Sequence, residues 1–424
     1  MAMFEKIRSL RKNKTLVNGS VFSLFSFLNQ GISFLLLIIL AKYILPGDYG
    51  KLSLYNTIVM FVGYFIAMST QGYISVVFFK DQKQVPSYFT SVMTISAMAF
   101  LLMLGICAVG CLCGGGLMGG FPFIYWLAAL LCSLFMMLMN VNLDLYRCKE
   151  SLKPYGLVSC GFAAVNFVFS LVLVIPLELS WNGRIIAQLV AAIFFAICAI
   201  VFFLRQRLFV LSFDKSKIKE LLFWGMPLIP HLATNWIRQG CDRYIISYNH
   251  TLSDVGIFSF ALNISNIIVM IGHAFNQSNS VSVYKILGSS EMDVPTKLLR
   301  LKQERRNIIA IYVVALIVLS IACSLLVPVF LPKYADSVGY FLVLNVYGFF
   351  VCLYLAYCNY LFFFKKNKTI MKITFGSALA HLVLSLFLTR YSLYYTALIY
   401  CATQGFVFLI IRHKALQTLK TDLT

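Results

Sequence analysis

The chain has 424 residues, of which 60% are hydrophobic and only 12% are charged, and its mean hydropathy is +0.85. Soluble domains usually carry about a quarter charged residues, so the composition excludes a soluble globular protein. A net charge of +20 would suggest nucleic acid as the partner of a soluble protein. Here the basic residues stand in short loops between apolar segments, as in membrane proteins, and we expect no nucleic-acid partner.

Apolar segments long enough to cross a bilayer recur along the whole chain. The first is too long for a signal-peptide core and lacks a small-residue cleavage site, so we interpret it as a membrane span. The sequence therefore predicts an all-α polytopic membrane protein. We expect twelve transmembrane helices, near residues 17–40, 52–79, 87–113, 122–145, 155–176, 183–204, 221–245, 255–283, 307–330, 338–364, 370–389 and 392–411.

The distribution of basic residues predicts the orientation of these spans. If both termini are cytoplasmic, about four in five of the 35 Lys and Arg residues fall on the cytoplasmic side. Arg238 lies inside the seventh span. The opposite side has only Lys42, Lys51, Arg184, Arg243, Lys333 and Arg390. This asymmetry also requires an even number of spans.

The chain divides near its middle. The connection at 205–220 predicts an N-terminal six-helix lobe at residues 1–206, a cytoplasmic linker at 207–220 and a C-terminal six-helix lobe at 221–424. A short motif, D-x-G-x-x-S, follows the first span at residues 48–53 and the seventh at 254–259. Its recurrence at the same junction predicts a duplicated unit with parallel topology.

Motifs for ATP and metal chemistry are absent or weak. The sequence has no G-x-x-x-x-G-K-[ST] phosphate loop, so we expect no ATP hydrolysis and no cofactor. Cys111 and Cys113 form the one close pair among 12 cysteines, and a lone C-x-C without a nearby His predicts no metal site.

The seventh span carries an unusual set of polar residues. At about 100° per residue, they fall within about 60° of each other on one helix face. They are His231, Asn235, Arg238 and Asp242. An arginine at the bilayer centre costs ~2.5–3.5 kcal/mol, so we expect it to face a partner or a wet cavity. A simpler interpretation is a buried Arg238–Asp242 pair at spacing i, i+4 that only holds helices together.

Two prolines precede this polar face. Pro227 and Pro230 remove two backbone donors within one turn and predict a bend in the seventh span.

Polar residues also line the eighth span, where Asn263, Asn266, His273 and Gln277 lie near one face. The first span has Gln30 among several serines. Single buried polar groups can hold helices together at ~0.6 kcal/mol each, but the collected stripes favour a shared hydrated cavity. A cavity with Arg, His and amides but one deep acid suits an anionic, hydroxyl-rich substrate.

Four segments carry a family resemblance, namely residues 41–50, 223–230, 241–246 and 254–259. Together and in this order they resemble Wzx-type O-antigen and capsular polysaccharide flippases of the multidrug/oligosaccharidyl-lipid/polysaccharide exporter superfamily. The resemblance implies two six-helix bundles that form a V-shaped central cavity, and a function for the Asp242–Arg243 pair. Twelve spans rather than fourteen disfavour a peptidoglycan-precursor flippase.

The leading hypothesis is a flippase that moves a polyprenyl-pyrophosphate-linked oligosaccharide from the cytoplasmic to the outer leaflet of the bacterial inner membrane by alternating access. The candidates for binding pyrophosphate are Arg238, Arg243 and Lys42. Those for binding sugar hydroxyls are Asn235, Gln30, Asn263, Asn266 and Gln277. Those for proton or sodium coupling, or for gating, are Asp242, His231, His273, Pro227 and Pro230. The expected partners are the lipid-linked substrate, membrane lipids and a polysaccharide polymerase, and we expect a monomer.

Two alternatives belong to other classes. A cation-coupled multidrug exporter of the same superfamily would need several buried acids, and this chain offers few. A membrane enzyme, such as a polymerase or glycosyltransferase, would need a sizeable outer loop or paired carboxylates at a loop–helix junction, and neither is visible. The sequence therefore favours a transporter over an enzyme.

Overall fold

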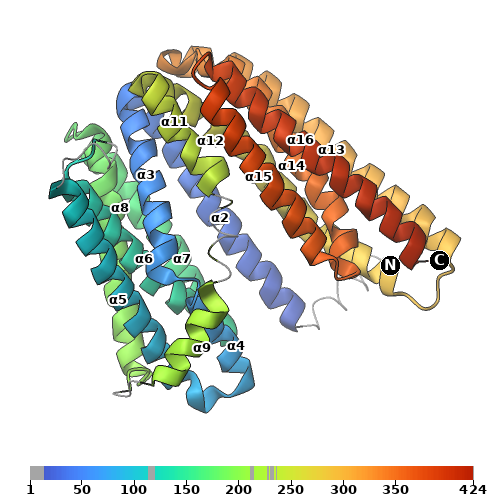
Figure 1. Ribbon diagram of the computed structural model, residues 1–424, viewed down its shortest axis with the longest axis horizontal. Helices are drawn as coiled ribbons and strands as arrows, with labels where there is room; N and C mark the ends of the chain where they lie inside the picture. Colours follow the sequence, from blue (N-terminus) through green and yellow to red (C-terminus); the bar gives the residue numbers. More distant parts are fainter. Residues whose placement is uncertain are drawn as a thin grey trace. The chain divides into compact units, whose positions relative to one another are not determined.

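The computed structural model describes residues 14–112, 120–210, 214–226, 229, 234 and 236–423, and these contain helices and turns but no strand (Figure 1). Ten helices in this part of the chain are long and apolar enough to cross a membrane. The α2 helix adds a shorter apolar stretch, Phe27–Tyr43. The prediction of an all-α polytopic membrane protein is confirmed, and the twelve-helix arrangement is consistent with the structure.

The helices in chain order are α2 (Lys14–Tyr43), α3 (Pro46–Ala67), α4 (Gln71–Lys80), η1 (Gln82–Gln84), α5 (Val85–Leu112), α6 (Phe123–Cys148), α7 (Leu152–Val174), α8 (Ser180–Arg205), α9 (Lys215–Gly225), η4 (Ile237–Cys241), α11 (Asp242–Asn249), α12 (Leu252–Gly288), α13 (Val294–Phe330), η5 (Pro332–Tyr334), α14 (Ser337–Phe363), α15 (Asn367–Leu388) and α16 (Leu393–Asp422). The predicted seventh span corresponds to α9, η4 and α11. The predicted bend at Pro227 and Pro230 lies outside the described residues.

The chain forms two compact units. The first comprises Met1–Ile44 and Tyr55–Ala233, and the second comprises Leu45–Leu54 and Thr234–Thr424. The start of α3 therefore belongs to the second unit, although the rest of that helix belongs to the first. The lobe boundaries expected from the sequence stay a prediction.

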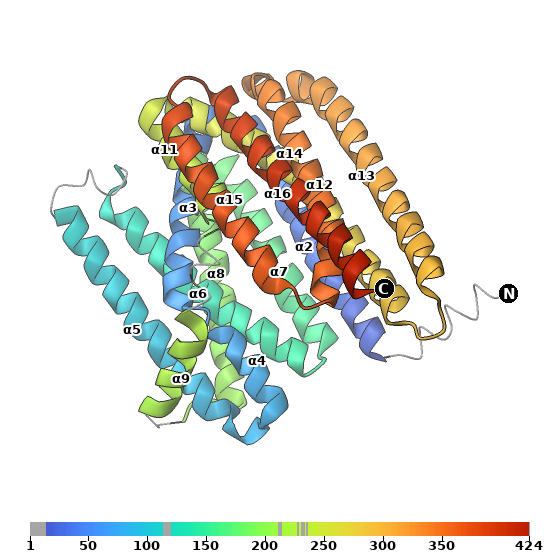
Figure 2. The ribbon, with the colours of Figure 1, turned by 45° about the vertical axis from the view of Figure 1, so that its right-hand side comes forward.

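In the first unit, α7 lies along both α2 and α8, and α8 also packs on α6 (Figure 2). Phe89 of α5 and Phe203 of α8 are fully buried and meet edge to face, with 4.7 Å between ring centres. Ala191 and Ala199 of α8 are buried as well. Small residues of this kind let neighbouring helices approach closely in a membrane, where apolar side chains gain little by leaving lipid.

The predicted span at residues 52–79 is interrupted. Met68 and Ser69 have φ values of 45° and 55°, in the left-handed region, and so α3 ends at Ala67 and α4 begins at Gln71. A Cβ added at Gly225 would collide with the Met68 carbonyl oxygen. The end of α9 therefore rests directly on this turn.

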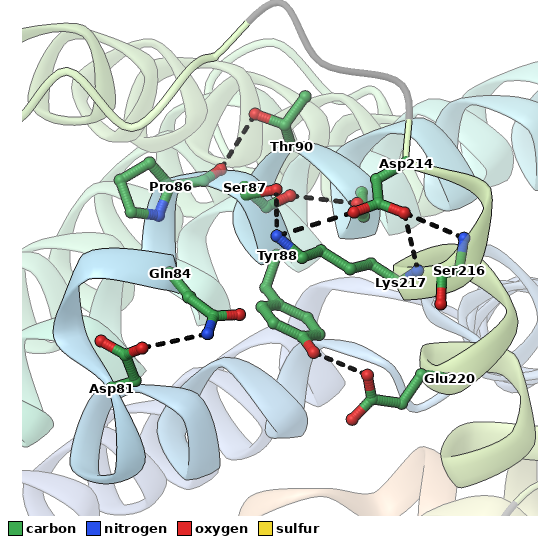
Figure 3. Close-up of polar contacts among 11 residues, drawn as sticks. Asp81, Gln84, Pro86, Ser87, Tyr88, Thr90, Asp214, Ser216, Lys217 and Glu220 are labelled. Atoms are coloured by element: carbon green, nitrogen blue, oxygen red, sulfur yellow. Dashed lines mark hydrogen bonds and ion pairs between the residues drawn. The ribbon is translucent and has the colours of Figure 1, made fainter.

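The start of α9 is fixed to the first unit by polar contacts (Figure 3). Asp214 caps the helix by accepting hydrogen bonds from the backbone nitrogens of Ser216 and Lys217, at 3.0 and 3.3 Å. The Lys217 Nζ donates to the Ser87 hydroxyl of α5 at 2.8 Å. These bonds tie the predicted linker, residues 207–220, to α5.

Glu220 extends this attachment to two helices. It accepts hydrogen bonds from the hydroxyls of Tyr73 on α4 and Tyr88 on α5. Figure 3 shows the bond from Tyr88, which is 2.6 Å long. These two hydrogen bonds lower the pKa of Glu220 below its usual value, and the nearby Lys80 and Lys217 add to the effect. The carboxylate form therefore stabilises the docked position of α9.

The second unit is built around α12, α14 and α16, with α14 packed between the other two and α15 packed along α16. Its core includes Tyr312, Tyr360 and Ile411, which are fully buried. The α13 helix contacts α12 and α14 and leaves most of its apolar surface exposed. Gly272 and Gly348 each let α12 and α14 approach closely, because a Cβ at either position would collide with the opposite helix.

The two copies of the D-x-G-x-x-S motif contact each other within the second unit. A capping box formed by Thr251 and Asp254 starts α12. A Cβ at Gly50 would collide with the carbonyl oxygen of Leu252, and a Cβ at Gly256 would collide with that of Pro46. Each glycine thus meets the residue four positions before the other glycine. The predicted duplication stays a prediction, and the two motif copies pack against each other.

We predict that Gly50→Ala and Gly256→Ala destabilise the protein, because the new methyl group meets a backbone carbonyl that no side-chain rotation can move aside. Overpacking of this kind costs ~1–3 kcal/mol or more. The matched control is Gly47→Ala in the same turn, where a Cβ has no neighbour within 4 Å. Thermal melting of the purified protein in detergent should show a lower Tm for the first two variants alone. Equal Tm values for all three would contradict the prediction.

We also predict that acid loosens α9. Because the folded-state pKa of Glu220 is lowered, its contribution is complete above the usual pKa of a glutamate and is lost as the pH falls through the lowered value. Hydrogen exchange of residues 215–225, corrected for intrinsic rates, should rise at low pH. The Tyr73→Phe/Tyr88→Phe variant should show this exchange already at neutral pH, and Glu291→Gln should behave as the unmodified chain does. Unchanged exchange in the double variant would refute the assignment.

Candidate functional site

A buried acid–imidazole pair lies inside the second unit. The side chains of Asp242 on α11 and His381 on α15 are each 1% exposed, and His381 Nε2 lies 2.7 Å from Asp242 Oδ2. The other ring nitrogen, Nδ1, lies 3.2 Å from the Thr403 hydroxyl of α16. That hydroxyl donates to the Ile399 carbonyl at 2.7 Å, which leaves its oxygen able to accept a hydrogen bond from Nδ1. Each ring nitrogen of His381 thus has a polar partner on another helix.

Arg238 belongs to the π-helical turn η4. Its guanidinium donates to Gln404 Oε1 of α16 at 2.6 Å and to the Thr374 carbonyl of α15 at 3.2 Å. The Arg238 Nε is buried and has no hydrogen-bond partner among the described residues. The Tyr400 hydroxyl donates to the Arg238 carbonyl. Within the described chain, the hydrogen-bond partners of this cation are thus neutral.

The simpler interpretation, a buried Arg238–Asp242 ion pair, is wrong. Among the described ion pairs, Asp242 is joined to His381, and Arg238 contacts α15 and α16 instead. The π-helical turn explains the difference, because its i→i+5 hydrogen bonds place side chains at other angles than a regular α-helix does. Turns of this type recur at functional sites, since they free a backbone carbonyl and redirect side chains.

Arg243 faces the interior of the second unit. Its Nε donates to the Ser259 hydroxyl of α12 at 3.1 Å, and a terminal nitrogen donates to the Gln239 carbonyl at 2.5 Å. Ser259 belongs to the second copy of the repeated motif and is fully buried. The Arg243 side chain is therefore held by α12 inside the second unit and does not simply anchor the helix at the membrane interface.

The polar residues predicted on α12 have different environments. Asn263 donates to the Tyr49 hydroxyl at 2.8 Å, which links α12 to the start of α3. Asn266 is partly buried, whereas His273 and Gln277 are exposed. The structure thus assigns Asn263 a packing contact and leaves the side chains of His273 and Gln277 accessible.

The remaining predicted residues lie elsewhere. Gln30 and Lys42 are exposed on α2 of the first unit. Four predicted residues fall outside the part of the chain that the structure describes, namely Pro227, Pro230, His231 and Asn235. Their proposed parts in binding, coupling and gating stay predictions.

Sequence reasoning left His381, Thr403, Gln404 and Tyr400 out of the site. Each is a single polar or aromatic residue in an apolar span, a pattern that equally indicates ordinary helix packing. Arg184, near the start of α8, donates to Asn166 Oδ1 and the Ser170 hydroxyl of α7, at 2.6 and 3.3 Å. Among the described residues, no group of three or more His, Cys, Asp or Glu side chains is placed to hold a metal.

Comparison with solved structures identifies the fold. The chain is similar to an inward-facing multidrug resistance MATE family transporter of the MOP superfamily, with a TM-score of 0.73 and 11% identity over 92% of this chain and 94% of that one. It is also similar to the lipid II flippase MurJ in an inward closed conformation, with a TM-score of 0.68 and 14% identity over 94% and 91% of the two chains. The fold is that of the MOP-superfamily transporters.

The family follows from the sequence itself. The family model described as polysaccharide biosynthesis protein matches residues 15–280, more than half of the chain, and the protein belongs to this family. A protein of the Lsg locus of Haemophilus influenzae is 23% identical over 80% of this chain and 82% of its own length. An uncharacterized membrane protein of the same organism is 22% identical over 83% and 84%. The resemblance noted in the sequence is confirmed, and the protein is a multi-pass membrane protein of this family.

We predict that breaking the Asp242–His381 pair destabilises the second unit. His381→Leu leaves a buried carboxylate without its partner, a change that typically costs ~3–5 kcal/mol. The Asp242→Asn/His381→Gln variant replaces the pair by two amides that can hydrogen-bond, and should recover most of the lost Tm. The matched control is His273→Leu, which alters an exposed histidine. Thermal melting of the purified variants tests this prediction. A His381→Leu protein with the same Tm as the control would contradict it.

Proposed function

We propose that the protein is a flippase for a polyprenyl-pyrophosphate-linked oligosaccharide, an O-antigen or capsular repeat unit. It moves this substrate from the cytoplasmic to the outer leaflet of the bacterial inner membrane by alternating access of its two lobes, with both termini in the cytoplasm. Membership of the polysaccharide biosynthesis protein family supports the substrate class. The sugar is too polar to cross hydrocarbon unaided, whereas the polyprenyl chain remains in the lipid.

The observation that carries the proposal is the environment of Arg238. Its hydrogen-bond partners in the described chain are an amide oxygen and a backbone carbonyl, and the nearby tyrosines add no negative charge. Asp242, the acid four residues after Arg238, is already paired with His381. A guanidinium held by neutral acceptors inside a membrane protein retains its charge for an anion, and its planar donors match phosphate oxygens.

The other predicted residues complete the proposal. Arg243 and Lys42 provide further positive charge for the pyrophosphate. Sugar hydroxyls are recognised by the amides of Gln30, Asn235, Asn263, Asn266 and Gln277. Asp242 with His231 and His273 couples a proton or sodium ion, and Pro227 and Pro230 allow gating. A polysaccharide polymerase receives the product from a monomeric flippase.

The membrane potential favours the proposed direction. An inside-negative potential drives an anion outward by ~2.3 kcal/mol per charge per 100 mV. A pyrophosphate carried with its charge uncompensated would therefore move outward downhill. Cation binding at the acid would change this balance, so the charge carried with each substrate sets the driving force.

A cation-coupled multidrug exporter is the second candidate. The likeness to a MATE family transporter shows the shared fold. The buried Asp242–His381 pair is the specific feature that favours this alternative, because it provides one acid for cation coupling. Drug resistance on overexpression that is lost in Asp242→Asn would support it.

We predict that Arg238→Ala abolishes transport although the protein accumulates normally. In a strain that lacks its own flippase for the repeat unit, surface polysaccharide should fall by about tenfold or more, as expected when a charge-assisted phosphate contact is lost. Arg238→Lys should restore little, because an ammonium lacks the planar fork of donors. The control is Arg300→Ala, an exposed residue of α13. Normal surface polysaccharide with Arg238→Ala at unchanged protein level would disprove the proposed anion contact.

A further inference from the structure

Gln404 of α16 is a buried, neutral residue in contact with the Arg238 side chain. It is 4% exposed, and its Oε1 accepts a hydrogen bond from the guanidinium at 2.6 Å. Because a guanidinium has donors and no acceptor, this contact fixes the direction of the amide. The oxygen points to Arg238 and the amide nitrogen points away from it. The glutamine therefore holds the cation through its oxygen alone.

A glutamate has nearly the same size and shape as this glutamine. At position 404 it would place a carboxylate against the guanidinium, and a charge-assisted ion pair would form in the same geometry. Such a pair would cancel the charge of Arg238. None of the ion pairs in the described chain includes Arg238, and Asp242, the acid nearest to it in the sequence, is joined to His381. The neutral amide of Gln404 thus keeps Arg238 in place without neutralising it.

The Arg238 guanidinium also has a donor that is not used. Besides Gln404, the Thr374 carbonyl of α15 accepts a hydrogen bond from it at 3.2 Å. The Arg238 Nε is buried and has no hydrogen-bond partner among the residues that the structure describes. A buried donor without an acceptor is unfavourable, so a ligand oxygen that reaches it would be bound favourably. Ionised phosphate groups present several acceptor oxygens and match this arrangement.

Tyr347 of α14 lies beside the same cation. Its ring meets that of Tyr400 edge to face, with 5.1 Å between ring centres, and the Tyr400 hydroxyl donates to the Arg238 carbonyl. Tyr347 is close enough to Arg238 for an electrostatic interaction. The Tyr347 hydroxyl makes no hydrogen bond within the described part of the chain. It is therefore a second donor for an anion bound at Arg238.

We propose that Gln404 and Tyr347 are further residues of the pyrophosphate site, and that Gln404 determines its preference for an anion. Tyr347 donates its hydroxyl to a phosphate oxygen beside Arg238. Gln404 positions the guanidinium and, because it is neutral, leaves the positive charge to the ligand. This inference rests on the proposed function and adds the residue that selects the charge of the ligand.

The first test changes the charge at position 404 with little change in shape. Binding of geranyl pyrophosphate to the purified full chain in detergent is measured by calorimetry. Gln404→Glu should bind it about tenfold more weakly or worse, because the new carboxylate neutralises Arg238 and repels the ligand. Its Tm should equal or exceed that of the unmodified chain, since a buried cation gains a partner. The matched control is Gln417→Glu, which adds the same charge at an exposed position of α16 and should bind normally.

The second test removes one hydroxyl and keeps the ring. Tyr347→Phe should bind geranyl pyrophosphate about tenfold more weakly, as expected when a hydrogen bond to a charged group is lost. The control is Tyr340→Phe, seven residues earlier on the same helix face, where the ring packs on Tyr394. Inorganic pyrophosphate should displace the ligand, and geraniol, which lacks the phosphates, should bind far more weakly.

The inference is overturned if either test variant binds as its control does, or if Gln404→Glu loses binding together with a lower Tm. Equal binding of geraniol, or no displacement by inorganic pyrophosphate, would also overturn it. Arg238→Ala separates this inference from the proposed function. If Arg238→Ala binds geranyl pyrophosphate normally, the proposed anion contact itself fails. If Arg238→Ala loses binding while Gln404→Glu and Tyr347→Phe retain it, only the assignment of Gln404 and Tyr347 fails.

Discussion

The second unit depends on one constraint, that charges buried in a membrane protein must find partners within the protein. The pair formed by Asp242 and His381 meets this constraint by joining α11 to α15, and the contact with Thr403 extends the link to α16. Three helices are thus fixed by one polar connection. Removing either partner would leave a charge or a polar ring in an apolar interior, at a larger cost than a lost hydrophobic contact.

The same pairing determines the electrostatics of the candidate site. Asp242 is paired with His381, and Arg238 is hydrogen-bonded to Gln404 and a backbone carbonyl and not to Asp242. A direct Arg238–Asp242 pair would have cancelled the cation and left a neutral site. The π-helical turn that separates their directions therefore has a chemical consequence, since it preserves a positive charge at a position suited to binding an anion.

Hydrophobic length and loop charge were sufficient to predict the helical class and the membrane spans, because both depend on composition over about 20 residues. The unusual polarity of Arg238 also singled out a side chain that the structure joins to α15 and α16. The partner of Asp242 could not be predicted, since His381 is 139 positions away and a single histidine in an apolar span has no periodic pattern. The break after Ala67 was missed because the two residues with left-handed backbone conformation are Met68 and Ser69. Neither is a glycine, the residue that usually signals such a turn.

The repeated motif connects these local constraints to the organisation of the chain. Gly50 and Gly256 each leave the space that the backbone of the other motif copy occupies. A side chain at either glycine would therefore displace the opposite copy. The first copy lies in a short segment, Leu45–Leu54, that packs with the second unit, while the same helix continues into the first unit from Tyr55. The two copies of the D-x-G-x-x-S motif are therefore in physical contact. Its tightness holds the start of α3 against the start of α12 within the second unit.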